Sequence, residues 1–125
     1  MTNSETALAI VQRFVAAMFA NDLDAMRRCC SPSFAHWYNT SDREMTLDEM
    51  LVDNERLGLG LGANFTMTPR HRYAFANGVV SELTYGWDSE NGPVRTHVCV
   101  VTTVDANGLI DRINEYVDSS VLPVA

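Results

Sequence analysis

The sequence predicts an α+β fold in which helices come first and a curved antiparallel sheet then folds around a pocket. In the first half of the chain, apolar residues recur at three- and four-residue spacing, as on one face of a helix. The second half contains four strand-like segments separated by turn signals. The last segment places Glu115 between the apolar residues Ile113 and Val117 on one face. The length of 125 residues suits one domain spanning 1–125.

Charge argues against several classes of partner. The net charge is −7, and all nine basic residues are arginines. The single basic cluster, Arg70-His71-Arg72, is interpreted as a solvated strand face. An acidic domain without a basic run has no electrostatic footprint for nucleic acid or anionic lipid, so neither is expected as a partner.

The remaining composition predicts a cytoplasmic protein. No apolar run is long enough to span a membrane, and Met1–Glu5 does not begin a signal peptide. The three cysteines are an odd number, Cys29 and Cys30 are adjacent, and no C-x-x-C motif is present. These features favour reduced thiols in the cytoplasm.

Two helices are expected at the start of the chain. Ser4 is a candidate N-cap for the first, and Glu5 suits the positive end of its dipole. Asn21-Asp22 ends this helix and can cap a short second helix that reaches about Cys30. The first helix has its apolar face at Ala7, Leu8, Val11, Phe14, Val15, Met18 and Phe19.

A short strand and a third helix follow. The aromatic segment Phe34–Asn39 predicts a strand. Thr46 and Glu49 form a capping box, which predicts a helix that Gly58 ends. The glycines of 58–62 lack the spacing and the following helix of a nucleotide-binding loop, so this segment is interpreted as a flexible helix exit.

Four strands are expected in the second half, and short turns between them predict an antiparallel meander. The strands are predicted at 66–76, 79–88, 94–104 and 109–118, with turns at Asn77-Gly78, Glu90–Pro93 and Asp105–Gly108.

Glu115 is the most informative residue for chemistry. It lies between Ile113 and Val117 on the apolar face of the last strand. A carboxylate there is costly to ionise unless it is paired. Such a group suits a general acid or base, and it equally suits a structural glutamate that is paired or capped by hydrogen bonds. The sequence leaves both readings open.

The turn at Asp105–Gly108 determines which residues face Glu115. It suits a type I turn with Gly108 in the left-handed conformation of a bulge, which pairs Asp105 with Leu109. Counting back then places Cys99 opposite Glu115, with His97 on the same face. A two-residue turn would reverse this parity.

Two other strand faces remain open. In the strand predicted at 79–88, the residues facing the pocket are either Leu83, Tyr85 and Trp87 or Glu82 and Thr84. Hydrophobicity favours burial of the first set. A dimer interface on the outer face would bury that set equally, so the direction of this strand stays open. On the short strand, one of two pairs could line a pocket: Trp37 and Asn39, or His36 and Tyr38.

The order of elements, ending in Gly108-Leu-Ile-Asp-Arg112-Ile-Asn-Glu115-Tyr116-Val-Asp118, resembles the NTF2-like superfamily and, within it, the SnoaL-like domains. The resemblance implies a cystatin-like cone in which three N-terminal helices pack on a curved antiparallel sheet that encloses a pocket. The superfamily includes ketosteroid isomerases, polyketide cyclases, limonene epoxide hydrolases, a dehydratase and non-catalytic modules.

The resemblance also implies roles. Glu115 takes the position where the epoxide hydrolases carry a water-activating Asp, and Trp37 and Asn39 are similar to their water-holding Tyr and Asn. Where those enzymes have an Arg and a second Asp, this chain has Glu82 and Thr84.

We therefore expect acid–base chemistry of the polyketide cyclase or isomerase type on a small apolar substrate of up to polycyclic size, without cofactor or metal. The expected catalytic residues are Glu115, His97 and Asn39. The expected substrate contacts are Phe14, Met18, Trp37, Tyr85, Trp87 and Cys99. The alternative is a non-catalytic ligand-binding or dimerisation module. In either case we expect a homodimer through the outer face of the sheet.

Overall fold

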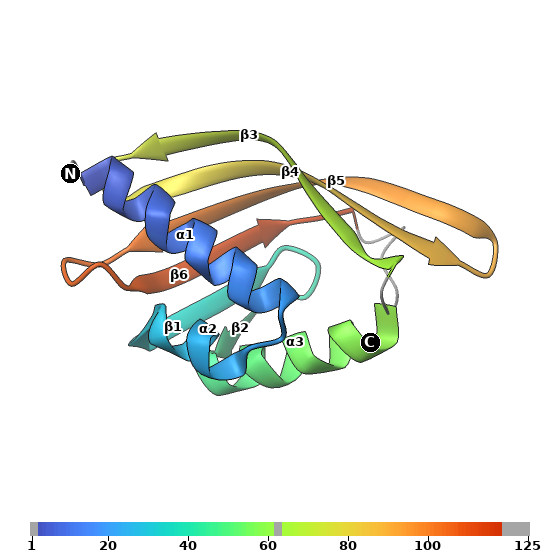
Figure 1. The fold of residues 1–125 in the computed structure, drawn as a ribbon, viewed down its shortest axis with the longest axis horizontal. Helices are drawn as coiled ribbons and strands as arrows, with labels where there is room; N and C mark the ends of the chain where they lie inside the picture. Colours follow the sequence, from blue (N-terminus) through green and yellow to red (C-terminus); the bar gives the residue numbers. More distant parts are fainter. Residues whose placement is uncertain (1–2, 62–63, 119–125) are drawn as a thin grey trace.

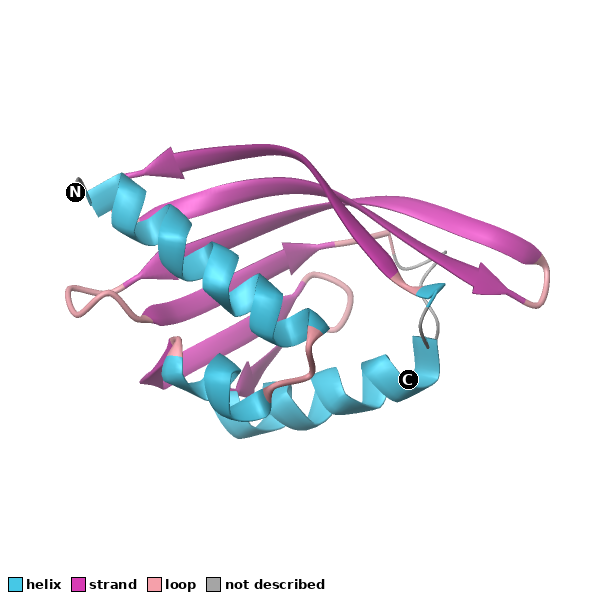
Figure 2. Ribbon diagram, viewed as in Figure 1, coloured by secondary structure: helices cyan, strands magenta, loops and turns pink. Residues whose placement is uncertain are grey.

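The computed structural model describes residues 3–61 and 64–118, which form three helices and a six-stranded sheet (Figures 1 and 2). In chain order the elements are α1 (Asn3–Phe19), α2 (Leu23–Arg28), β1 (Cys30–Tyr38), β2 (Arg43–Thr46), α3 (Leu47–Leu61), β3 (Thr66–Phe75), β4 (Gly78–Ser89), β5 (Gly92–Val104) and β6 (Ile110–Tyr116). The α+β prediction is confirmed, and strand β2 was not predicted.

The sheet has the strand order β2-β1-β6-β5-β4-β3. Strands β3 to β6 form the predicted antiparallel meander. Strand β1 pairs in parallel with β6, and β2 then adds antiparallel to β1. The first strand of the chain therefore lies beside the last one.

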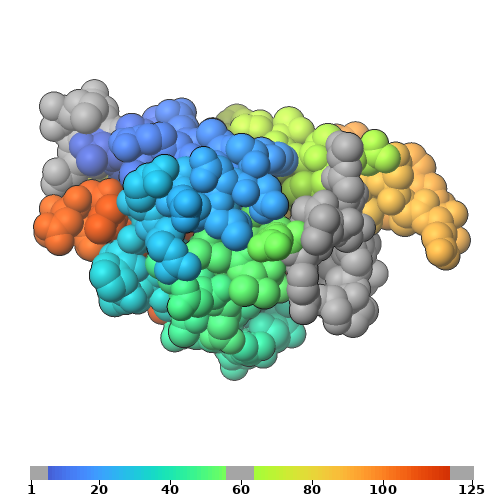
Figure 3. Space-filling view, turned by 60° about the horizontal axis from the view of Figure 1, so that its bottom comes forward, coloured from blue at the N-terminus to red at the C-terminus, as the bar shows by residue number. Residues whose placement is uncertain are grey.

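The helices cover one face of the sheet, which we call the inner face. Helix α1 crosses β3, β4 and β5, whereas α3 packs on β1 and β2 (Figure 1). The core lies between them and includes Phe14, Met26, Leu51 and Ile113. In the space-filling view, the tip of the β4–β5 hairpin (orange, right) projects beyond the helices (Figure 3).

Local signals explain most helix boundaries. The Asp22 side chain accepts a hydrogen bond from the Ala25 N–H and caps α2. The predicted capping box before α3 is present, because the side chains and N–H groups of Thr46 and Glu49 bond reciprocally. Two boundaries were wrong: α1 begins at Asn3, so Ser4 lies inside it, and α3 continues past Gly58.

The β5–β6 register differs from the prediction by one residue. The predicted turn is confirmed: the Asp105 N–H donates to the Leu109 carbonyl at 2.8 Å, and Gly108 has φ of +76°. However, Val104 pairs with Ile110 while Thr103 pairs with Arg112, so Asp111 is an additional bulged residue. This second bulge reverses the parity of the remaining hairpin and places Val100, instead of Cys99, opposite Glu115.

Within residues 3–61 and 64–118, no helix has both the length and the apolar character needed to cross a membrane.

Candidate functional site

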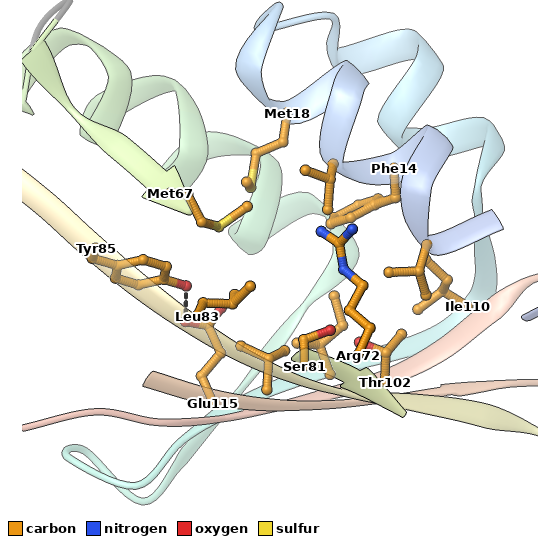
Figure 4. Close-up of a pocket in the computed structure, with 14 residues that line it drawn as sticks. Phe14, Met18, Met67, Arg72, Ser81, Leu83, Tyr85, Thr102, Ile110 and Glu115 are labelled. Carbon is orange, nitrogen blue, oxygen red and sulfur yellow. Dashed lines mark hydrogen bonds between the residues drawn. The ribbon is translucent and has the colours of Figure 1, made fainter. Parts of the chain in front are cut away.

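Glu115 lies on the inner face of β6, and both of its carboxylate oxygens have a protein partner. Its Oε1 is 2.8 Å from Nε2 of His36. The Tyr85 hydroxyl donates to Oε2 at 3.1 Å (Figure 4). The Glu115 side chain is 13% exposed and that of His36 is 6% exposed. The network is therefore almost dry, which strengthens each of its hydrogen bonds.

Three strands bring these groups together. The parallel ladder between β1 and β6 pairs Tyr38 with Glu115 and His36 with Ile113. Tyr85 comes from β4, two strands away from β6, and reaches the carboxylate across β5. The site therefore depends on pairing between the two ends of the chain.

The hydrogen bonds of His36 indicate the protonation state of the pair. Its Nδ1 atom is buried and has no hydrogen-bond partner among residues 3–61 and 64–118. A protonated Nδ1 would leave a buried donor unsatisfied, and in an imidazolium that donor would also carry charge. The geometry favours a neutral imidazole that donates from Nε2 to an ionised Glu115.

Two phenols surround this carboxylate. Burial, followed by the charge of Glu115, raises the pKa of Tyr85 well above its ordinary value. Burial, with smaller contributions from Glu115 and Asp53, raises the pKa of Tyr38 in the same way. The Tyr38 ring also packs on His36, with ring centroids 4.5 Å apart. Both hydroxyls thus remain protonated over the ordinary pH range.

Glu115 and Tyr85 border a cavity of about 50 Å³ between α1 and the sheet. Its walls are mainly apolar, and Met18 and Met67 face each other across it (Figure 4). The lining also includes Val11, Phe14, Val15, Arg72, Ser81, Leu83, Val100, Thr102, Ile110 and Ile113. This volume holds a few water molecules, so a polycyclic molecule would enter only if side chains moved.

Three of the expected substrate contacts line this cavity, namely Phe14, Met18 and Tyr85. The open question of parity in β4 is resolved, because Leu83, Tyr85 and Trp87 share the inner face. Trp87 is buried on this face but does not line the cavity.

The other aromatic and thiol contacts are on the outer face. Because of the bulge in β6, His97 and Cys99 point away from Glu115, and the expectation that they share its face is wrong. The ring Nδ1 of His97 instead lies 3.1 Å from the Thr84 hydroxyl. Trp37 also faces outward, where its ring packs edge-on against Tyr116.

Asn39 supports the backbone of the site. Its Nδ2 donates to the Val117 carbonyl at 3.1 Å, and its Oδ1 accepts from the Val117 N–H at 2.9 Å. The amide therefore continues the β1–β6 ladder by one more residue, and both of its ends are occupied. A substrate-holding role for Asn39 receives no geometric support.

The interpretation of Arg70-His71-Arg72 as one solvated face needs correction. Arg70 and His71 are exposed, but Arg72 lies on the inner face opposite Ser81 and lines the cavity. A bulge between Pro69 and His71 sets this direction.

Metal and thiol chemistry find little support in the described part of the chain. Within 3–61 and 64–118, no three His, Cys, Asp or Glu side chains are grouped to hold a metal ion. Cys29 and Cys30 are buried, and burial raises the pKa of the Cys30 thiol to about 12.

Comparison with known proteins found no matching family model and no match among curated proteins. Solved structures do match. A Catenulispora acidiphila protein with a ketosteroid isomerase-like fold, solved with trimethylamine, has a TM-score of 0.74 and 16% identity over 90% of this chain and 87% of its own. A Mycobacterium tuberculosis LEH-like epoxide hydrolase has a TM-score of 0.73 and 19% identity over 94% and 86%.

A protein assigned as a SnoaL-like polyketide cyclase from Jannaschia sp. CCS1 gives a TM-score of 0.80 and 12% identity over 92% of this chain and 87% of its own. At these identities the likeness establishes the fold and does not select a reaction. The chain thus has the NTF2-like fold, shared with ketosteroid isomerase-like, SnoaL-like and epoxide hydrolase proteins, as the sequence resemblance predicted.

Proposed function

We propose that this protein is a small-molecule enzyme of the isomerase or cyclase kind, which moves protons on a largely apolar substrate without an organic cofactor. The observation that carries the proposal is the environment of Glu115. Its carboxylate is nearly buried, borders an apolar cavity and is bound by His36 and Tyr85 instead of by an arginine.

Glu115 would act as the general base. A carboxylate that is shielded from water can take a proton from a carbon next to a carbonyl group, and the C–H electrons then form an enolate. When the enolate is conjugated with a carbon–carbon double bond, returning the proton to the far carbon of the conjugated system shifts the double bond, gives an isomer and restores the carboxylate. In a cyclisation, the enolate carbon instead attacks a second carbonyl group, and the new alkoxide takes the proton.

Tyr85 and His36 would have different roles. Tyr85 lines the cavity, and its raised pKa keeps its hydroxyl protonated. That single O–H donates to Glu115 in the free protein, so it would turn from Oε2 to the carbonyl oxygen of a bound substrate and leave Oε2 free to take the proton. His36 is not among the residues that line the cavity, and it contacts the Glu115 carboxylate from outside the cavity. We assign His36 as a positioning residue that orients the carboxylate.

The experiment uses proton exchange, because removal of a proton from carbon is common to these reactions. A panel of cyclic ketones is incubated with the protein in deuterium oxide, and exchange at the acidic carbon is followed by NMR. We expect Glu115→Gln, which is nearly isosteric, to slow exchange about 100-fold or more. Glu82→Gln on the outer face is the matched control and should leave the rate unchanged.

Equal exchange rates in the wild type and Glu115→Gln, with a ketone that binds both, would contradict the role of Glu115. Binding without exchange in the wild type would support a second candidate, a non-catalytic ligand-binding module. Two observations favour this second candidate. Both oxygens of Glu115 already have partners, and the cavity of about 50 Å³ is small.

A further inference from the structure

Arg72 is a cation on the cavity wall that the proposed proton transfer does not use. Its side chain leaves β3 on the inner face and extends toward Phe14 of α1 (Figure 4). Its Nε–H is buried and donates to no acceptor in the described part of the chain. Among the side chains of residues 6–55 and 64–118, no carboxylate lies within ion-pair distance of Arg72.

This arrangement differs from that of the paired arginines on the surface. Arg27, Arg43 and Arg112 each contact a carboxylate, and all three pairs are substantially exposed. A guanidinium against an apolar wall loses favourable hydration, and only an ion pair with an anion compensates for that loss. Glu115 is the one carboxylate in the described cavity lining, and its oxygens are bound to other groups.

Two hydroxyl groups extend the donor set. Ser81 and Thr102 lie on the inner face and line the cavity with Arg72. Both residues are almost fully buried, at 4% and 3% exposure, and neither hydroxyl bonds to another residue in the described part of the chain. A guanidinium and two free hydroxyls form a set of donors that suits the two oxygens of a carboxylate.

We infer that the cavity binds an apolar carboxylic acid as its carboxylate, with the acid group at Arg72 and the hydrocarbon part directed toward Glu115. The charge of Glu115 repels the acid group and so fixes this orientation. The identity of the reacting end rests on the proposed function, which makes the substrate an apolar oxo acid. Met18 and Met67 are unbranched and flexible, so they can move apart to admit it.

The experiment compares cyclohexanecarboxylate with its neutral, nearly isosteric primary amide by titration calorimetry at constant ionic strength. We expect the wild type to bind the acid at least about 10-fold more tightly than the amide. Arg72→Met should abolish this preference and leave the amide affinity unchanged. Arg70→Met, at an exposed position on the same strand, should retain the preference.

Stability provides a second measurement. Removing an uncompensated charge should leave the melting temperature of Arg72→Met unchanged or raised. A lower melting temperature would identify Arg72 as a structural group and overturn the inference. Equal affinities of the wild type for the acid and the amide, or absence of saturable acid binding, would also overturn the inference. An equal loss of the acid preference in Arg70→Met and Arg72→Met would overturn it as well. Inorganic phosphate that binds as tightly as the acid would also overturn it.

Glu115→Gln separates this inference from the proposed function. If only the inference fails, the acid preference is absent while deuterium exchange still depends on Glu115. If only the proposed function fails, Arg72 still selects the acid and exchange does not depend on Glu115.

Discussion

At the scale of single residues, the site is a balance between burial and hydrogen bonding around Glu115. A nearly dry carboxylate is tolerated because His36 and Tyr85 each contact one of its oxygens. Hydrogen bonds to a charged group contribute roughly 1.5–3 kcal/mol each, about twice the contribution of neutral ones. The same contacts that stabilise Glu115 also fix its orientation toward the cavity.

The two buried phenols predict how stability depends on alkaline pH. Because the folded pKa values of Tyr38 and Tyr85 lie above the value of about 10 for an unfolded chain, the folded state keeps protons that the unfolded state releases. Their contribution to stability is therefore complete below about pH 10 and is lost as the pH rises toward the folded pKa values.

We expect the phenolate absorbance of these two rings to appear together with loss of circular dichroism. Tyr85→Phe should remove about half of that unfolding-linked absorbance. A gradual phenolate signal from both rings in a protein that remains folded would contradict the burial of these hydroxyls.

At the scale of elements, the parallel pairing of β1 with β6 holds the site together, and Asn39 closes it. We expect Asn39→Ala to lower the free energy of unfolding by about 1–3 kcal/mol, because the Val117 N–H and carbonyl both lose their partner. Urea denaturation measures this difference. Asn91→Ala, at the exposed β4–β5 turn, is the control. Equal stability of the Asn39 and Asn91 variants would contradict the structural role.

Helix starts and turns that have a local sequence signal were predictable. The direction in which strand side chains point was not predictable where it depends on pairing between strands far apart in the sequence. The Thr46–Glu49 capping box and the Asp105–Gly108 turn both have local sequence signatures, and both are present. The bulge at Asp111 was not predicted, and it places His97 and Cys99 on the outer face. Nothing local marks the β1–β6 pairing that turns His36 inward.

Arg72 shows the same limit. Its neighbours Arg70 and His71 are exposed, and the composition of the triplet predicts a solvated face. Alternation along the strand could have separated Arg72 from His71, but a further bulge after Pro69 obscures the count. Phe14 and Met18 were predictable, because apolar periodicity alone places them on the buried face of the first helix. The sequence left the direction of Tyr85 open, and the pairing of β4 with β5 decides it.

At the scale of the whole molecule, the helices cover one face of the sheet, and the outer face has no layer of helices within the described residues (Figure 2). This face carries the exposed aromatic side chains of Tyr73, Phe75 and Tyr116. The homodimer that the sequence predicts would bury them. We expect light scattering at micromolar concentration to give the mass of two chains, and Tyr116→Asp to reduce it toward one. A wild-type mass of one chain would contradict the prediction.

The central claim is that Glu115 is an ionised base held by a neutral His36, and the protonation of that imidazole tests it without a substrate. Nitrogen-detected NMR distinguishes the two ring nitrogens of His36. The structure predicts a protonated Nε2 and an unprotonated Nδ1 at neutral pH, since Nδ1 is buried without a partner among the described residues and Nε2 lies 2.8 Å from Oε1. A proton on Nδ1 with none on Nε2 would make the Glu115 carboxyl the donor and would contradict its role as base.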